Sequence, residues 1–250
     1  MKGEKNLILA TGGNSILYFS LPAFFKACEK YELEFDEIHC TGFSCIPAYF
    51  YLKTNSSNQS YMYLRSIYDE TLKNFHFAFG FNFTNIVEQI RTLYKASRTL
   101  KGFKSQRALI KYVNRHFEDE KIPKKLKIHA FNLKTFNDEI LEHDTLQEAM
   151  IKTLSLPLEF EPYNDYVSGS WVYGVPEGDF VLLINKIFNF DLKNAVDFMI
   201  YSTYARTFKI MEKRFNDAKH KLRLQTNSSN PFYLSAKLYE ISEKYIGGKL

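Results

Sequence analysis

The order of short apolar runs and tight turns in the first 53 residues constrains this chain more than any other feature. We predict a buried strand at Asn6–Ala10, a helix at Ile16–Glu32, a second strand at Glu37–Cys40 and a second helix at Pro47–Lys53. A turn separates each strand from the helix that follows it. This alternation predicts a parallel sheet with helices on its faces.

The rest of the chain continues the mixture of helices and strands without a linker, so we predict one domain over residues 1–250. We predict that the stretch 61–117 is largely helical, with breaks near Gly80 and Gly102. The further predicted elements are strands at 125–133, 136–141, 166–175 (with a turn at Gly169) and 180–187, and helices at 146–153, 191–224 and 231–245. The predicted class is α/β with a mainly parallel central sheet.

Composition and charge exclude several classes of protein. Lys and Arg total 33 against 28 Asp and Glu, and the resulting net charge of +5 is too mild to indicate nucleic-acid binding. No apolar stretch reaches the ~18 residues of a membrane span, and no signal-peptide core follows Met1. We therefore expect a cytoplasmic protein, with peripheral membrane contact left open. The three cysteines are expected to be packed thiols, and neither a metal site nor a cofactor is predicted.

The sharpest local signal is the string Thr41-Gly42-Phe43-Ser44-Cys45 at a predicted strand-to-helix junction. A serine on such a turn can act as a nucleophile, and the amides that follow it can stabilise an oxyanion. The alternative is an ordinary turn in which Ser44 caps the helix. Upstream, the amides of Gly12 and Gly13 could bind phosphate or complete an oxyanion hole, but the spacing of a dinucleotide-binding loop is missing.

Several segments together resemble the patatin-like phospholipase family. The family's glycine loop and nucleophile elbow correspond to Leu7–Gly13 and Ile38–Ser44, and its Asp-Gly-Gly signature falls at Tyr166–Pro176. Between them, Lys127–Leu133 is similar to the family's next strand and Leu146–Pro162 to its helix and proline segment. The resemblance covers roughly residues 6 to 187 in the family's order.

This resemblance implies a three-layer α/β/α fold and a Ser–Asp dyad that attacks the acyl esters of lipids. Ser44 would be the nucleophile, and the amides of Gly12, Gly13 and Cys45 would be the oxyanion donors. The substrate would be an acyl lipid or another ester.

The chain departs from the family where the chemistry should occur. Ser168 occupies the position of the general-base Asp, and a serine hydroxyl cannot take up a proton at neutral pH. Ile46 replaces the last glycine of the elbow, and Asp165 is the nearest carboxylate that could act as a substitute base. Two functions therefore stay open. One is a lipid acyl hydrolase, and the other is a catalytically inactive relative that binds acyl lipid, a membrane or a protein partner.

Three further features each have two interpretations. The spacing of Arg91, Lys95 and Arg98 predicts that they share one helix face, which either is simply solvated or contacts anionic headgroups of a membrane. The aromatic run Asn74–Phe83 is either core or a lid beside a lipid site. His39 and His129 lie in predicted strands, where we expect hydrogen-bonded core histidines rather than catalytic bases.

Overall fold

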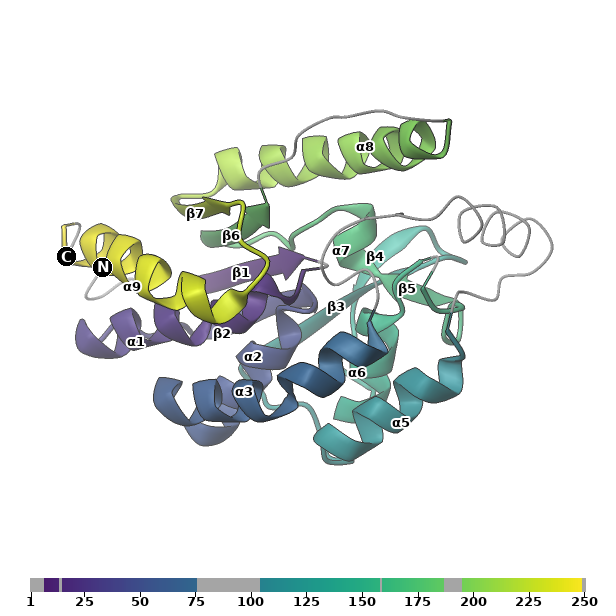
Figure 1. The fold of residues 1–250 in the computed structure, drawn as a ribbon, viewed down its shortest axis with the longest axis horizontal. Helices are drawn as coiled ribbons and strands as arrows, with labels where there is room; N and C mark the ends of the chain where they lie inside the picture. Colours follow the sequence, from purple (N-terminus) through teal and green to yellow (C-terminus); the bar gives the residue numbers. More distant parts are fainter. Residues whose placement is uncertain (1–6, 14, 76–103, 158, 187–194, 249–250) are drawn as a thin grey trace.

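The computed structural model describes residues 7–13, 15–75, 104–157, 159–186 and 195–248. These residues form an α/β fold in which helices flank a mixed, mostly parallel sheet of seven strands (Figure 1). The predicted α/β class and the mainly parallel sheet are confirmed.

Six strands of the sheet lie in the order β4-β3-β2-β1-β6-β7, and the seventh, β5, pairs with β3. Pairing is parallel from β3 through β7, whereas β4 and β5 each run antiparallel to β3. The strands are β1 (Ile8–Gly13), β2 (Glu37–Gly42), β3 (Leu126–Asn132), β4 (Asn137–Ile140), β5 (Tyr166–Ser168), β6 (Phe180–Lys186) and β7 (His220–Thr226). The first strand in the chain is therefore central, because β2 and β6 pair with its two edges.

Helices cover both faces of the sheet, with α8 on one side and α1, α2, α3 and α9 on the other (Figure 1). The α-helices are α1 (Pro22–Lys30), α2 (Cys45–Thr54), α3 (Ser57–Asn74), α5 (Gln106–His116), α6 (Leu146–Leu154), α7 (Gly169–Val172), α8 (Ala195–Asp217) and α9 (Pro231–Gly247). A 3₁₀ helix, η1 (Ile16–Ser20), follows β1.

The two faces of the sheet carry cores of different size. The larger core takes inward-facing strand residues such as Leu9, Ile38 and Ile128, together with the helices on that side. The smaller one, under α8, contains Ala10, Val175, Val181, Leu183, Met211 and Ala218. Alternation along each strand sends neighbouring side chains to opposite faces, which is why Leu9 and Ala10 belong to different cores. The smaller core does not extend to β2 and β3, where polar side chains occupy the same face.

Three predicted elements differ from the structure. The helix predicted at Ile16–Glu32 is divided into η1 and α1, because Pro22 is accepted only as the first residue of a new helix. The strand predicted at 166–175 ends at Ser168 and is followed by the short helix α7. The helix predicted at 191–224 ends at Asp217, and β7 follows it with Leu222, Leu224 and Thr226 facing inward.

Within the described part of the chain, none of the helices has both the length and the apolar character to cross a membrane.

Candidate functional site

The predicted serine turn lies where β2 ends and α2 begins. Gly42 has a φ of +66°, a left-handed conformation that favours glycine, and it lies opposite Gly13 of β1 in the sheet register. The amide of Phe43 donates to the carbonyl oxygen of Gly13 at 3.0 Å. The predicted glycine loop and the serine turn are therefore held together at the same edge of the sheet.

Ser44 itself is fully buried, with an exposed fraction of 0%. Its hydroxyl lies 2.9 Å from the carbonyl oxygen of Thr11 and 3.0 Å from that of Thr41, and it donates to these acceptors. Its backbone is in the ordinary helical region, with φ of −67° and ψ of −21°. A backbone carbonyl accepts a hydrogen bond but cannot take up the proton of a nucleophile, so these contacts hold Ser44 in place without activating it.

The segment that carries Ser168 packs against this turn. Ser168 lies opposite Ala130 at the end of β5, and its Oγ atom lies 2.6 Å from that of Ser170. A Cβ atom on Gly42 would collide with the Ser170 hydroxyl. The structure thus brings the Ser168–Ser170 segment to the serine turn, and the groups that it supplies there are hydroxyls.

Asp165, the alternative base, is not brought to Ser44. Its carboxylate forms an ion pair with Lys134 at 2.6 Å, and its side chain is 47% exposed. The residue lies in the turn before β5, where its carbonyl oxygen accepts from the amide of Leu133. Ser44 is fully buried, and its hydroxyl donates to the carbonyl oxygen of Thr11. The side chains of Asp165 and Ser44 therefore occupy different environments.

The glycine loop is closely packed by protein atoms. The hydroxyl of Tyr18 donates to the carbonyl oxygen of Gly12, and the ring of Tyr18 lies against Gly13. A Cβ atom on Gly12 would come within 2.8 Å of the Cα atom of Val175. Both glycines are therefore required for close approach of neighbouring segments, whatever else their amides do.

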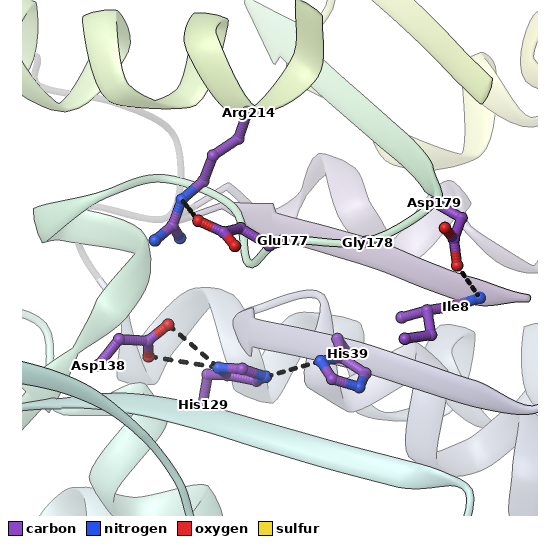
Figure 2. A pocket seen from close by; sticks show the side chains of 8 residues that line it. All are labelled: Ile8, His39, His129, Asp138, Glu177, Gly178, Asp179 and Arg214. Carbon is purple, nitrogen blue, oxygen red and sulfur yellow. Dashed lines mark hydrogen bonds and ion pairs between the residues drawn. The ribbon is translucent and has the colours of Figure 1, made fainter. Parts of the chain in front are cut away.

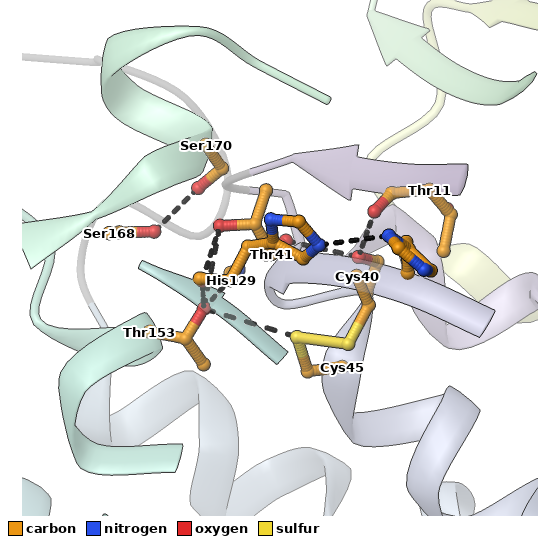
Figure 3. Close-up of a disulfide and its surroundings, with 11 residues drawn as sticks. Thr11, Cys40, Thr41, Cys45, His129, Thr153, Ser168 and Ser170 are labelled. Carbon is orange, nitrogen blue, oxygen red and sulfur yellow. Dashed lines mark hydrogen bonds between the residues drawn. A yellow bond between two sulfur atoms is a disulfide. The ribbon is translucent and has the colours of Figure 1, made fainter. Parts of the chain in front are cut away.

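The cysteines correct one prediction. Cys40 at the end of β2 and Cys45 at the start of α2 form a disulfide, with Cα atoms 5.1 Å apart, and only Cys28 is a buried free thiol (Figure 3). The turn reverses the chain between them, and this brings the two residues within the usual Cα separation of a disulfide. Ser44 lies within the short loop that the disulfide closes. Cys45, the predicted oxyanion donor, is thus also a structural crosslink.

A threonine pair fills the space beside the disulfide (Figure 3). The hydroxyl of Thr153 lies 2.8 Å from the carbonyl oxygen of His129 and accepts from the amide of Gly42 at 2.8 Å. Thr41 donates to the same carbonyl of His129 at 3.0 Å. The site around Ser44 is thus built from neutral hydroxyl and carbonyl groups.

A second constellation lies on the face of the sheet that α8 partly covers. A pocket of about 560 Å³ opens there, which we call the histidine pocket, and its lining residues are Ile8, His39, His129, Asp138, Glu177, Gly178, Asp179 and Arg214 (Figure 2). This volume lies within the usual range of small-molecule sites.

The polar groups of this pocket form a continuous chain. The Nε2 atom of His39 lies 2.8 Å from Glu37, and its Nδ1 atom lies 3.0 Å from the Nε2 atom of His129. The Nδ1 atom of His129 lies 3.2 Å from Asp138, which also accepts from the hydroxyl of Tyr173 at 2.6 Å. The chain therefore has a carboxylate at each end and two imidazole rings between them.

Burial sets the acid–base properties of these groups. It lowers the pKa of His39, although the hydrogen bond that His39 donates to Glu37 acts in the opposite direction. Burial also raises the pKa of the Tyr173 hydroxyl well above its usual value, and the charge of Asp138 adds to this effect. Tyr173 is therefore a neutral donor to Asp138.

The histidine pocket contains residues that the sequence did not indicate as a site. His39 and His129 were expected to be hydrogen-bonded histidines in strands, and they are, but their association with Asp138 and Arg214 was not predicted. His39 lies opposite Lys127, two residues before His129, so the contact between the rings depends on the register of β2 against β3. The one available signal was a histidine in each of two neighbouring predicted strands.

Some predicted residues cannot be placed. Arg91, Lys95 and Arg98 and most of the aromatic run 74–83 lie outside the described residues. Asn74 and Phe75 are the exceptions, and Phe75 is fully buried and contacts the rings of Phe43 and Tyr112. Among the described residues, no group of three His, Cys, Asp or Glu side chains is arranged to hold a metal ion.

Comparison with known proteins adds no assignment, since the chain matches no protein-family model and no curated protein.

Proposed function

We propose that this chain is a divergent patatin-like protein that does not hydrolyse esters through Ser44 and instead uses the three-layer α/β/α scaffold for binding. The family resemblance indicates an acyl lipid as the ligand. The observation that carries the proposal is the environment of Ser44, whose buried hydroxyl donates to backbone carbonyls. A nucleophilic serine needs a base within hydrogen-bond reach, and the neighbouring segment supplies Ser168 and Ser170 instead.

A lipid acyl hydrolase is the second candidate, and one specific observation favours it. The Gly42–Ser44 turn and the Ser168–Ser170 segment lie together, as a nucleophile and its base would. Ser168 at the general-base position and Ile46 in the elbow then separate the chain from the family's dyad. The loss of a general base typically lowers a rate by about 10²- to 10⁴-fold.

A fluorophosphonate probe distinguishes the two candidates. We expect that the purified chain and its Ser44→Ala variant show the same background labelling and no turnover of phospholipid or short acyl esters. Labelling that the wild type shows and Ser44→Ala loses would overturn the proposal. Ser168→Asp is the complementary variant. Ser44-dependent activity that appears only in this variant would show that the wild-type protein is inactive because it lacks the carboxylate at position 168.

Peripheral contact with an anionic membrane stays a separate prediction for Arg91, Lys95 and Arg98. Sedimentation with vesicles that contain or lack anionic lipid tests it. Binding that depends on anionic lipid and weakens with salt is expected. Binding that ignores both variables would contradict it.

A further inference from the structure

The number of protons in the histidine pocket follows from its hydrogen bonds. The chain Glu37–His39–His129–Asp138 contains three links, and each link needs one proton. The carboxylates at the two ends accept only, so all three protons belong to the imidazole nitrogens. Two neutral imidazoles carry one N–H each, which is one proton fewer than the chain requires.

Every link of this hydrogen-bonded series therefore has its hydrogen only when the histidine pair holds one additional proton and a single positive charge. Without that proton, one of the three links has no hydrogen: either a carboxylate oxygen faces an unprotonated ring nitrogen about 3 Å away, or two unprotonated ring nitrogens face each other at 3.0 Å. With a second additional proton, the two rings would direct N–H groups at each other across the 3.0 Å link. The singly charged pair is the one state in which every link is satisfied.

Charged groups on every surrounding element act on this proton. Glu37 and Asp138 stabilise it directly, while Lys127, whose Nζ atom lies 3.8 Å from Glu37 and 2.7 Å from Glu142, weakens that effect. The other groups that face the pocket are Tyr173 after α7, Glu177 and Asp179 before β6, and Arg214 on α8. The side chains of His39 and His129 are only 11% and 8% exposed. Because burial lowers the pKa of His39, the additional proton is exchangeable rather than permanent.

Arg214 supplies a fixed positive charge on the opposite side of the pocket (Figure 2). Its guanidinium group stacks on the ring of Tyr173 at 4.5 Å and donates to the carbonyl oxygen of Val175 at 2.7 Å. Its carboxylate partner is Glu177, at 3.6 Å from the Nε atom and with a side chain that is 82% exposed. The guanidinium is thus held by two contacts, whereas its counter-ion is loosely held and open to exchange.

We propose that the histidine pocket binds a small carboxylate-bearing molecule, whose carboxylate replaces Glu177 on Arg214 and whose binding is coupled to uptake of one proton by the His39–His129 pair. The other carboxylates of the pocket already have partners, since Asp138 accepts from Tyr173 and Asp179 accepts from the amide of Ile8 at 3.1 Å. An anion between Arg214 and the histidine pair interacts with two positive charges, and it favours the protonated pair. This site does not depend on whether Ser44 is a nucleophile.

Benzoate is a suitable probe, with benzylamine as a cationic control of the same size. We expect that benzoate shifts the imidazole NMR signals of His39 and His129 and that benzylamine does not. The affinity for benzoate is expected to rise by up to tenfold for each unit by which pH falls, through the range in which the pair gains its proton. Ser44→Ala is expected to bind benzoate like the wild type.

Two variants test the assignment from opposite directions. Arg214→Gln is expected to weaken benzoate binding by about tenfold or more, whereas Arg107→Gln, at an exposed position of α5, should leave it unchanged. Glu177→Gln removes the competing carboxylate and is expected to tighten binding by about two- to fivefold. Its side chain is largely exposed, so this variant tests the proposal even if Arg214→Gln does not fold.

The proposal is overturned if benzoate does not bind, if benzylamine binds in its place, or if benzoate binding is indifferent to pH. It is also overturned if Glu177→Gln binds benzoate no more tightly than the wild type.

Discussion

Ser170 packs so closely against Gly42 that no side chain can be added to the glycine. One residue belongs to α7 and the other to the end of β2, more than a hundred positions earlier in the chain. Their contact joins the serine turn to the segment in which the family resemblance expects a general base. It is therefore one of the contacts that hold the two halves of the candidate serine site together.

Gly42→Ala should destabilise the fold by about 2–4 kcal/mol. The new Cβ atom would collide with the Ser170 hydroxyl and lie 2.8 Å from the carbonyl oxygen of Gly13, and alanine disfavours the φ of +66° at this position. Denaturant unfolding gives the free energy. Ser170→Gly is the matched partner, because the double variant should recover only the part of the loss that is due to the collision with Ser170. Full additivity of the two losses would show that the side chains do not meet.

Ser44→Ala should destabilise the fold by about 1 kcal/mol, because a buried hydroxyl that donates to backbone carbonyls is lost. The sign of the change is informative. Residues kept for catalysis often cost stability, so replacing them is neutral or stabilising. A variant more stable than the wild type would therefore count against a structural role for Ser44. Thermal or denaturant unfolding of both proteins provides the comparison.

Thiol titration of the denatured chain should detect one thiol before reduction and three after it, since only Cys28 is free. Replacing both Cys40 and Cys45 with serine should lower the free energy of unfolding by about 2 kcal/mol, the value expected for a bridge that closes a short loop. Disulfides are typical of oxidising compartments, so the titration also bears on the predicted cytoplasmic location. Three thiols before reduction would contradict the bridge.

Stability should fall as pH rises above about 10. Burial raises the pKa of Tyr49 to about 12, and it also raises the pKa values of Tyr18 and Tyr112. A raised pKa in the folded state means that the neutral phenol stabilises the fold fully below the unfolded value near 10, and that this contribution is lost above it. Denaturant midpoints measured across this range test the sign.

Two variants provide the controls for the alkaline range. Tyr49→Phe cannot ionise and should show a smaller loss of stability with rising pH. Tyr233→Phe, at a position that is 79% exposed, should behave like the wild type. An equal dependence on pH in Tyr49→Phe would show that the ionisation of Tyr49 makes no contribution.

The central strands could be predicted from the sequence because their apolar runs are short and bounded by glycine turns. Strand β7 could not. The string His220–Thr226 alternates polar and apolar residues, but it follows a long helix after only two residues, so the helical pattern of α8 seemed to continue. Pairing with β6 along seven residues decides the outcome, and that partner is distant in the sequence. Tertiary context overrides local preference here.

The serine turn was predictable and the histidine pocket was not, for a physical reason. The residues around Ser44 are consecutive in the sequence and joined by one turn. The groups of the pocket come from β1, β2, β3, β4, α8 and the segment before β6, and they meet only through strand register and helix placement. The Cys40–Cys45 disulfide was only partly predictable. The sequence shows that the two cysteines are close together, but it does not show that the turn brings them within bonding distance.

The central position of β1 has a consequence for the order in which the strands can pair during synthesis. The strand precedes the other strands in the described sequence, yet its pairing with β6 must wait for residues 180–186, and η1 and α1 contact α9. A nascent chain paused before β6 would leave one edge of its innermost strand open to other chains. We therefore expect that fragments lacking β6 aggregate, and that the sheet closes only after β6 has been synthesised.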